Sequence, residues 1–369
     1  MYIIKLTLNG YRNYLYESVE FINGINVING RNAQGKTNLI EAVFYLATGR
    51  SFRSAVDKDL INFNNESASI RAEIISSERN QTLEARFCRG RRRVLLANDN
   101  KLKKASELSG KLTTVQFGPD DLNMVKDGAS VRRRLMDNCL TQLYPGYFAA
   151  LTEFNKLYDN KTRILKDHYE KPSLLELLED FNLRLAEQNA KIIKYRAAYV
   201  ENLSTKAFVI HKEFSGGAED LSLNYKTIND IAANEMSLEE IYSQLLAHQK
   251  DKYQAELRSG LCLSGSHKDD LLIEINGITA RKFASQGQAR TASISIKLAE
   301  RDIHFDYRGE YPVLLLDDVL SELDSSRREY ILSRVKTGQV IITCCEKEAL
   351  VNSDYNKLIN IQNGKVIEN

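Results

Sequence analysis

The segment GRNAQGKT, residues 30–37, decides how this chain folds, because it fits the pattern G-x-x-x-x-G-K-[ST]. INVI at 25–28 precedes it as a buried strand, and NLIEAVFYLA at 38–47 follows it as a helix. Glycines let the backbone curl so that successive N–H groups face a phosphate, and the helix N-terminus adds positive potential. A glycine-containing turn with a chance lysine is the alternative, but strand, loop and helix in this order favour a phosphate-binding loop.

This loop predicts ATP and Mg²⁺ as cofactors. Lys36 would bridge the β- and γ-phosphates and take a catalytic role, and Thr37 would ligate the metal. The residues that we expect to bind the nucleotide here are Gly30, Arg31, Asn32, Ala33, Gln34, Gly35, Lys36, Thr37 and Asn38.

A second motif, VLLLDDVLSELD at 313–324, places two acids directly after a run of apolar residues. This order is typical of a buried parallel strand whose carboxyl end carries the side chains of a site. Asp317 would hold Mg²⁺, directly or through water, and Asp318 would orient or deprotonate the attacking water. A core strand that ends in a solvated acidic turn is the alternative, which the presence of the phosphate loop makes less favoured.

Strand-like and helical patterns alternate in blocks along the chain. Residues 2–117 are mostly strand-like, with a predicted antiparallel meander of three strands between 68 and 97. After Pro119 the pattern becomes helical, with Ser130 as a plausible N-cap.

A helix of nearly forty residues is then predicted from Ser173, and another from Ser237 to Arg258. Strand-like segments return at 271–275, 311–317 and 339–343, with helices at 289–304 and 325–335. We therefore predict an α/β head formed by residues 1–118 and 260–369, and a helical arm inserted at 119–259.

The segment SQGQ, residues 285–288, lies directly before a helix whose alanines and isoleucine repeat at helical spacing. Ser285 can cap that helix, and Gly287 allows close approach of the backbone to an anion. An ordinary polar loop and helix cap is the simpler interpretation of these four residues alone. Their place after a phosphate loop and a helical insertion, and before the acidic pair, favours a functional role.

This order of motifs resembles the ABC-type ATPases of chromosome maintenance, and more closely the RecF family. The resemblance rests on GYRNY (10–14), GRNAQGKTNLIEA (30–42), GRSFR (49–53), FGPDDLNMVKDGASVRRRLMD (117–137), GSHKDDL (265–271), SQGQAR (285–290) and LLLDDVLSELD (314–324). It implies an ABC-type P-loop ATPase head, with a mixed sheet and an antiparallel meander, and an inserted helical arm. It also implies a weak, Mg²⁺-dependent and DNA-stimulated ATPase.

The resemblance implies that SQGQ is the ABC signature, which contacts ATP held by the loop of a second subunit. Ser285, Gly287 and Gln288 take that role by position, and Asp324 matches an aspartate that acts across the same interface. ATP would then drive a homodimer, and hydrolysis would release it. The implied function is binding to duplex DNA near single-strand gaps, in repair, recombination, replication and the SOS response. The implied partners are RecR, with RecO and RecA acting downstream.

Two departures from the family limit what is carried over. Ser266 stands where the family usually has proline, so a rigid turn is relaxed. ABC transporters have a histidine after the strand that follows the acidic pair, where this chain has Thr343, Cys344 and Cys345. Transporter-style sensing of the γ-phosphate by histidine is therefore not expected. Gln116 lies near the expected Q-loop, but its alignment leaves it outside the predicted site.

The net charge of +2 gives little long-range attraction for nucleic acid, so a DNA site must be local. Residues 89–104 contain seven cations against the single acid Asp99, and either DNA binding or a solvated hairpin face explains them. In the run Arg132–Arg134 at least one side chain should be structural, because three consecutive helical residues spread around the axis.

No motif that reads bases is present. The five scattered cysteines never form CxxC, no run of about 20 apolar residues exists, and the N-terminus reads as a strand. We expect a cytoplasmic, nucleoid-associated protein with no membrane partner. An ABC-type DNA-end ATPase subunit of a nuclease system is the alternative function, although the short stretch after Asp324 leaves little room for a nuclease domain. A scaffold with a degenerate nucleotide site is a third, which intact Lys36, Thr37, Asp317 and Asp318 disfavour.

Overall fold

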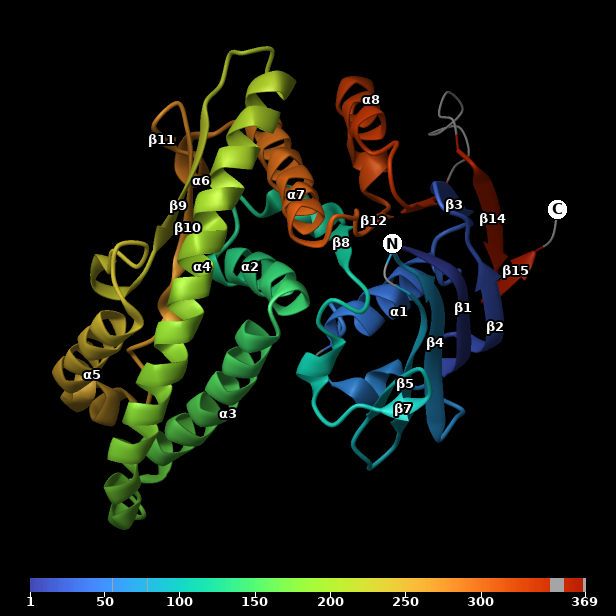
Figure 1. The fold of residues 1–369 in the computed structure, drawn as a ribbon. Helices are drawn as coiled ribbons and strands as arrows, with labels where there is room; N and C mark the ends of the chain where they lie inside the picture. Colours follow the sequence, from blue (N-terminus) through green and yellow to red (C-terminus); the bar gives the residue numbers. More distant parts are fainter. Residues whose placement is uncertain (55, 78, 346–354, 368–369) are drawn as a thin grey trace. The chain divides into compact units, whose positions relative to one another are not determined.

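The computed structural model describes residues 1–54, 56–77, 79–345 and 355–367 (Figure 1). Packing of the backbone divides the chain into two units. The first consists of Met1–Asn123 and Arg290–Asn369, and the second of Met124–Ala289. The helical insertion predicted from the sequence therefore corresponds to a separate compact unit, with a later C-terminal boundary than expected.

An antiparallel sheet forms one layer of the first unit, with strand order β2-β1-β4-β5-β6-β7. Its strands are β1 (Tyr2–Tyr11), β2 (Tyr14–Glu20), β4 (Ser67–Ile75), β5 (Asn80–Cys88), β6 (Val94–Ala97) and β7 (Asn100–Lys101). Along β4 alternate side chains are buried, so that one face of the sheet packs on the core. The predicted meander between residues 68 and 97 is confirmed by the antiparallel pairing of β4, β5 and β6.

The second layer of this unit is a mixed sheet with strand order β15-β14-β3-β13-β12-β8. Its strands are β3 (Ile25–Asn29), β8 (Thr114–Phe117), β12 (Val313–Asp317), β13 (Val340–Cys344), β14 (Lys357–Gln362) and β15 (Lys365–Ile367). All pairs are parallel except that of β14 with β15. Every residue of β12 is buried, as expected of a parallel strand covered on both faces. The strands β3, β12 and β13 confirm the prediction, whereas β14 and β15 were not predicted.

Helix α1 (Lys36–Thr48) lies between the two sheets. It contacts β12, β13 and β8 of the mixed sheet and β4 and β5 of the antiparallel sheet. Its apolar side chains join one hydrophobic core with residues of both sheets, such as Ile70, Leu83, Leu315 and Ile341. This burial fixes the first turn of α1 at the carboxyl end of β3, where the phosphate loop lies.

The second unit is built around four helices, α2 (Ala129–Leu143), α3 (Pro145–Asp167), α4 (Leu178–Phe214) and α5 (Leu238–Ser259). In Figure 1, α4 is the longest of them. Ala186, Ala190, Ile193 and Ala197 follow one face of α4 at helical spacing and pack with residues of α5. Ser237 forms a capping box with Glu240 at the start of α5, which confirms the predicted beginning of that helix.

A three-stranded antiparallel sheet, order β11-β10-β9, completes the second unit. Its strands are β9 (Leu221–Lys226), β10 (Asp270–Ile275) and β11 (Ile278–Thr279), and the short helix α6 (Ala280–Phe283) follows. Pairing of β10 with β9, a strand that was not predicted, ties the segment after residue 259 to this unit. The boundary therefore falls after Ala289, and not after residue 259 as the sequence pattern indicated.

Arg196 of α4 lies at the centre of a buried polar network in the second unit. Its guanidinium pairs with Asp137 at 2.8 Å and with Asp269 at 3.0 Å, and it donates to the carbonyl of Ser266 at 2.8 Å. Buried charges are stable only when paired and hydrogen-bonded. The network thus fastens α2, α4 and the segment before β10 together.

Helix α7 (Gln286–Arg308) begins in the second unit and ends in the first, and α8 (Ser325–Arg334) follows β12. Both predicted helices in this region are confirmed. Short 3₁₀ turns lie at Asp57–Leu60, Ala105–Leu108, Pro119–Asn123, Pro172–Leu177, Ile228–Asp230, Ser266–Lys268 and Val319–Glu322. None of the helices among the described residues combines the length and apolarity that crossing a membrane requires.

Two predicted helix starts need correction. Helix α2 begins at Ala129 with Gly128 as its N-cap, so Ser130 lies inside the helix. Helix α4 begins at Leu178 and not at Ser173, because a 3₁₀ turn that starts at Pro172 precedes it. The proline has no N–H and a fixed φ, which suits the start of such a turn.

Candidate nucleotide and metal site

The phosphate loop connects β3 to α1, as the sequence predicted. Ala33 and Gly35 have φ of +64° and +111°, so the loop curls back before the helix begins. A Cβ on Gly35 would lie 2.7 Å from Nδ2 of Asn13 and 2.8 Å from Oη of Tyr14. Glycine is therefore required at this position both by the backbone conformation and by the close neighbours.

The first turn of α1 has Gly35 as its N-cap, and no side chain caps it. No acidic residue lies in that turn. Backbone N–H groups at a helix start have no partner within the helix, and the helix dipole favours negative charge there. The site therefore offers donors to an anion at the position where the sequence predicted phosphate.

Lys36 is buried to 4% exposure, although it carries a charge. Its Nζ donates to the carbonyl oxygens of Gly30 at 2.9 Å and Arg31 at 3.3 Å, and lies 3.2 Å from Sγ of Cys345. Oδ2 of Asp318 is 3.8 Å from the same Nζ. The ammonium group is thus held inside the loop mainly by neutral partners, with one carboxylate at the limit of ion-pair distance. A phosphate can offer it stronger hydrogen bonds, because donor and acceptor would both be charged.

Thr37 and Asp317 are brought together although they come from different elements. The hydroxyl of Thr37 lies 3.0 Å from Oδ1 of Asp317, and the hydroxyl of Thr343 lies 2.9 Å from the same oxygen. Asp317 ends β12, and Thr343 is its partner in the register of β13. The mixed sheet therefore places a carboxylate directly beside the hydroxyl of the phosphate loop.

Hydroxyl and carboxylate oxygens are ligands that Mg²⁺ prefers, so the pair Thr37 and Asp317 fits the predicted metal. Burial raises the pKa of Asp317 above its ordinary value, while hydrogen bonds from Thr343 and Thr37 act in the opposite direction. A divalent cation at this position would favour the charged carboxylate and would take the place of the hydrogen bond from Thr37.

Asp318 has left-handed backbone angles, with φ 53° and ψ 9°. This conformation turns the chain directly after β12, and aspartate tolerates it better than most residues. The N–H of Asp318 donates to Oγ1 of Thr343 at 2.8 Å, and its side chain is partly exposed. Thr343 thus contacts both acids of the pair, with its hydroxyl donating to Asp317 and accepting from Asp318.

Residues at the turn between β1 and β2 donate hydrogen bonds to the backbone of the phosphate loop. The hydroxyl of Tyr14 donates to the carbonyl of Gly35 at 3.0 Å, and Nδ2 of Asn13 donates to the carbonyl of Gln34 at 3.1 Å. Asn38 donates to Asn13 at 2.7 Å and accepts from Arg53 at 2.7 Å. Two sequence segments, GYRNY and GRSFR, therefore meet at the start of α1.

Arg12 and Glu41 fasten this turn to α1 through two hydrogen bonds, of 2.9 and 2.6 Å. Glu41 is fully buried and also accepts from Tyr11 and Ser51. Beside the loop, a hollow of 520 Å³ is lined by residues that include Gly30, Arg31 and Gln34. The loop thus has a rigid support and an adjoining open space.

The predicted signature segment is in the second unit. Ser285 and Gln288 form a reciprocal cap at the start of α7: the N–H of Gln288 donates to Oγ of Ser285 at 3.1 Å, and the N–H of Ser285 donates to Oε1 of Gln288 at 2.9 Å. Capping by Ser285 is thereby confirmed. Its contact with a nucleotide, and that of Gly287 and Gln288, stays a prediction.

Asp324 is the N-cap of α8, where its carboxylate accepts from the N–H of Arg327 at 2.9 Å and also pairs with the Arg327 guanidinium. The backbone N–H of Arg327 is the main reason that the pKa of Asp324 lies below its ordinary value. Asp324 therefore has a local structural role, and its predicted action across a subunit interface stays a prediction.

The sequence interpretation missed the role of Thr343. The available signal was positional: in neighbouring parallel strands, a hydroxyl residue at the end of 339–343 stands level with an acid at the end of 313–317. Asn13 and Tyr14 belong to a segment that carries the family resemblance, but no spacing in the sequence indicated that they contact the phosphate loop.

Six of the seven cations between residues 89 and 104, all except Arg89, line a hollow of 460 Å³ at the edge of the antiparallel sheet. Arg93 is paired with Asp57 at 3.1 Å and contacts Tyr45, so it is structural. The remaining cations that line the hollow have no acidic partner among the described residues, and they are Arg91, Arg92, Lys101, Lys103 and Lys104. We call these five residues the basic hollow.

Arg132 is buried and pairs with Asp270 at 2.8 Å, and Arg133 donates to the carbonyl of Asp269 at 2.7 Å. Arg134 is exposed. The prediction that at least one of these three arginines is structural is confirmed.

The fold and the site define a P-loop ATPase head of the ABC type with an inserted helical unit. Residues 2–368 match the family model described as the RecF/RecN/SMC N terminal domain. The chain is 37% identical over 368 residues to the DNA replication and repair protein RecF of Acetivibrio thermocellus, with 99% of each chain covered. It is 36% identical over 371 residues to that of Clostridium acetobutylicum, with 100% of each chain covered. The chain therefore belongs to the RecF family.

Solved structures agree with this assignment. The structure of the recombination mediator protein RecF-ATPrS in the RecFOR pathway superimposes with a TM-score of 0.91 at 34% identity, covering 99% of this chain and 97% of that one. The Smc head domain from Pyrococcus furiosus, at 18% identity and a TM-score of 0.54, covers 99% of this chain and 96% of that one, and shows the shared fold alone.

Proposed function

We propose that this protein is an ATP-dependent DNA-binding ATPase of DNA replication and repair. The observation that carries this proposal is the position of the Thr37 hydroxyl 3.0 Å from the Asp317 carboxylate, beside the buried ammonium group of Lys36. The names of the RecF relatives, and a RecF structure described with ATP, support the same conclusion.

In this proposal residues of the phosphate loop and of the acidic pair each have a separate role toward ATP and Mg²⁺. Lys36 neutralises the β- and γ-phosphates, Thr37 and Asp317 hold the metal, and Asp318 orients or deprotonates the attacking water. The bound metal would supply Lewis-acid polarisation of the phosphate oxygens. Asp318 suits its role because it is partly exposed at the carboxyl end of β12, whereas Asp317 is buried.

We further propose that ATP joins two copies of the chain. The signature residues Ser285, Gly287 and Gln288, with Asp324, would contact ATP that the loop of the other copy holds. The capped start of α7 supports this role, because a helix N-terminus with a serine hydroxyl can donate to phosphate oxygens. Hydrolysis would remove the group that both copies share, so the homodimer would dissociate.

The proposed DNA surface is the basic hollow. Its five cations lack acidic partners among the described residues, so they are available to phosphates of the DNA backbone. Such contacts do not read sequence, which agrees with the absence of a base-reading motif. The preferred substrate in this proposal is duplex DNA near a single-strand gap.

The proposed cellular location, protein partners and pathway are inferred from the RecF family. We propose that the protein acts in the cytoplasm at the nucleoid, binds RecR, and works with RecO to load RecA in recombinational repair, replication restart and SOS induction. The alternative, an ABC-type ATPase subunit of a DNA-end nuclease system, differs in one assay: it requires cleavage of DNA with Mg²⁺ or Mn²⁺.

Sedimentation of the protein with and without ATP and a gapped duplex, at two salt concentrations, tests the proposal. ATP should shift the protein from monomer to dimer and should promote retention of DNA. Lys36→Met should abolish both effects. Ser285→Arg should keep ATP binding and lose dimerisation, whereas equal dimer formation by that variant would contradict the shared ATP site.

A further inference from the structure

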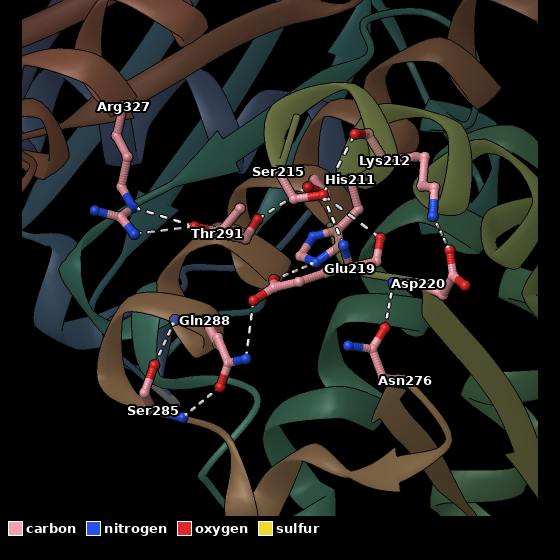
Figure 2. Close-up of polar contacts among 11 residues, drawn as sticks. His211, Lys212, Ser215, Glu219, Asp220, Asn276, Ser285, Gln288, Thr291 and Arg327 are labelled. Atoms are coloured by element: carbon pink, nitrogen blue, oxygen red, sulfur yellow. Dashed lines mark hydrogen bonds and ion pairs between the residues drawn. The ribbon is translucent and has the colours of Figure 1, made fainter. Parts of the chain in front are cut away.

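The side chain of Gln288, in the predicted signature, is held at both ends of its amide (Figure 2). Its Oε1 accepts from the N–H of Ser285 at 2.9 Å, and its Nε2 donates to Oε1 of Glu219 at 2.8 Å. The first bond belongs to the helix cap, but the second comes from a residue far away in the sequence. The helix cap alone holds only the Oε1 atom of the Gln288 side chain. The bond to Glu219 holds the Nε2 atom as well and so fixes the rotamer of Gln288.

Glu219 lies in the loop between α4 and β9, and that loop is itself fastened to the end of α4. Its Oε2 is 3.0 Å from Nε2 of His211, which is fully buried on the last turn of α4. Burial is the main reason that the pKa of His211 is below its ordinary value, which favours the neutral ring. A neutral ring with its proton on Nε2 donates to the Glu219 carboxylate. The N–H of Glu219 also donates to Oγ of Ser215 at 3.2 Å.

The neighbouring residue Asp220 has a different set of contacts. Its carboxylate pairs with Lys212 at 2.6 Å, and its N–H donates to Oδ1 of Asn276 at 2.8 Å (Figure 2). Both acids are thus held close to the end of α4, and of the two it is Glu219 whose carboxylate is bonded to Gln288. Asp220 is therefore a matched control for charge, position and loop structure.

The segment before the signature is held independently. Nζ of Lys126 donates to the carbonyl oxygens of Ala280 at 3.2 Å and Ala284 at 2.5 Å. These bonds hold the backbone directly before Ser285. They do not contact the side chain of Gln288, which Glu219 holds instead. The two supports come from different parts of the second unit and act on different atoms.

We propose that Glu219 is a positioning residue for the signature segment, joining Gln288 to the end of helix α4 through His211. This inference rests on the proposed function, in which Ser285 and Gln288 act on ATP held by a second copy. With Oε1 of Gln288 held on the N–H of Ser285, the serine hydroxyl accepts from the N–H of Gln288 and keeps its own O–H for a phosphate oxygen. A charged acceptor holds the amide more firmly than water does.

Three variants test the proposal: Glu219→Ala, Glu219→Gln and Asp220→Ala. Glu219→Ala should lower kcat for ATP about tenfold, the loss expected for one hydrogen bond to a charged group, and should leave KM within about twofold. Glu219→Gln should restore kcat to within about threefold of wild type, because its amide oxygen accepts from Gln288 and neutral His211 can change tautomer. Asp220→Ala should match wild type.

Hydrogen–deuterium exchange provides a readout that does not depend on ATP. Amides of residues 284–290 should exchange faster in Glu219→Ala than in wild type or Asp220→Ala. Equal exchange in the two alanine variants would overturn the proposal, as would a joint loss of kcat, ATP binding and melting temperature in Glu219→Ala. If wild-type protein neither dimerises on ATP nor hydrolyses it, the proposed function fails, and the exchange experiment still decides whether Glu219 positions the segment.

Discussion

The hydroxyl of Thr37 donates a hydrogen bond of 3.0 Å to the carboxylate of Asp317, across 280 positions of sequence. The parallel pairing of β3, β13 and β12 produces this contact, since the carboxyl ends of parallel strands meet at one edge of a sheet. The first residue belongs to the phosphate loop and the second to the acidic pair. Their meeting brings the two sequence motifs together at the position where we propose that the metal binds.

Thr343 should control the geometry of the acidic pair. Thr343→Val keeps the side-chain shape but removes the hydrogen bonds to Asp317 and from Asp318. We expect kcat for ATP to fall about 30-fold to 150-fold, because two bonds are lost and each contributes on the order of 1–1.5 kcal/mol. Nucleotide binding without Mg²⁺, measured by calorimetry, should stay within about twofold. Thr343→Ser restores the hydroxyl and should recover most of the rate; no recovery would refute the assigned role.

Gly35→Ala should destabilise the first unit and abolish ATP binding. The added Cβ meets Asn13 and Tyr14 at 2.7 and 2.8 Å and also requires an unfavourable positive φ. Gly309→Ala is the matched control, because Gly309 has φ of +71° and nothing lies within 4 Å of its added Cβ. We expect a loss of about 1 kcal/mol in the control and about 2–4 kcal/mol in Gly35→Ala, measured by urea unfolding. Equal losses would show that packing at Gly35 contributes nothing.

The basic hollow should set the salt dependence of DNA binding. Replacing Lys101, Lys103 and Lys104 by glutamine should reduce the slope of log affinity against log salt by about 0.9 for each DNA phosphate that is no longer neutralised. Affinity should fall uniformly across DNA sequences, as measured by fluorescence anisotropy.

The control for this experiment replaces three exposed lysines of the second unit, Lys171, Lys226 and Lys250, by glutamine. That variant should keep the wild-type slope. A lower slope in the control, together with an unchanged slope in the basic-hollow variant, would place the DNA contacts on the helical arm instead.

Stability should fall on acidification because His267 is buried as a neutral ring. Burial lowers its pKa to about 4, and its Nε2 donates to the carbonyl of Cys262 at 2.9 Å, while Nδ1 is buried without a hydrogen-bond partner. The unfolded chain binds a proton near pH 6.5 and the folded chain near pH 4, so the free energy of unfolding rises with pH between these values. We expect His267 to account for about 1–2 kcal/mol of the decrease in the free energy of unfolding between about pH 7 and pH 5.

Urea unfolding at both pH values checks this prediction. His267→Gln should show a smaller difference between the two pH values than wild type. Asp269 acts in the opposite direction, because burial raises its pKa to about 6 and the folded state holds that proton more tightly. An identical pH difference in His267→Gln and wild type would exclude the histidine as a source of the acid sensitivity.

The parts of the site that follow from the sequence are those fixed by local chemistry. Gly35, Lys36 and Thr37 are close together in the chain, and a strand and a helix flank them, so their arrangement depends little on distant residues. Asp317 and Asp318 were identifiable because they come directly after a run of apolar residues that is typical of a buried strand. In the same way the capping box at Ser237 and the cap at Ser285 depend on residues three positions apart.

The parts that did not follow depend on pairing between distant segments. The role of Thr343 requires the register of β12 with β13. The assignment of residues 260–289 to the second unit requires the pairing of β10 with β9. The six residues of β9, LSLNYK, alternate apolar and polar, but the sequence interpretation missed this short strand. The contact of Glu219 with Gln288 requires both the end of α4 and the start of α7, which no local pattern brings together.

The position of β3 has a consequence during synthesis of the protein. This strand, residues 25–29, lies between β13 at 340–344 and β14 at 357–362, so both of its neighbours leave the ribosome about 300 residues or more after it. Until then its apolar side chains have no sheet to join, whereas residues 124–289 are already complete and can fold as a unit. A nascent chain of this protein therefore carries an unpaired strand, which a chaperone can hold until β13 and β14 have been made.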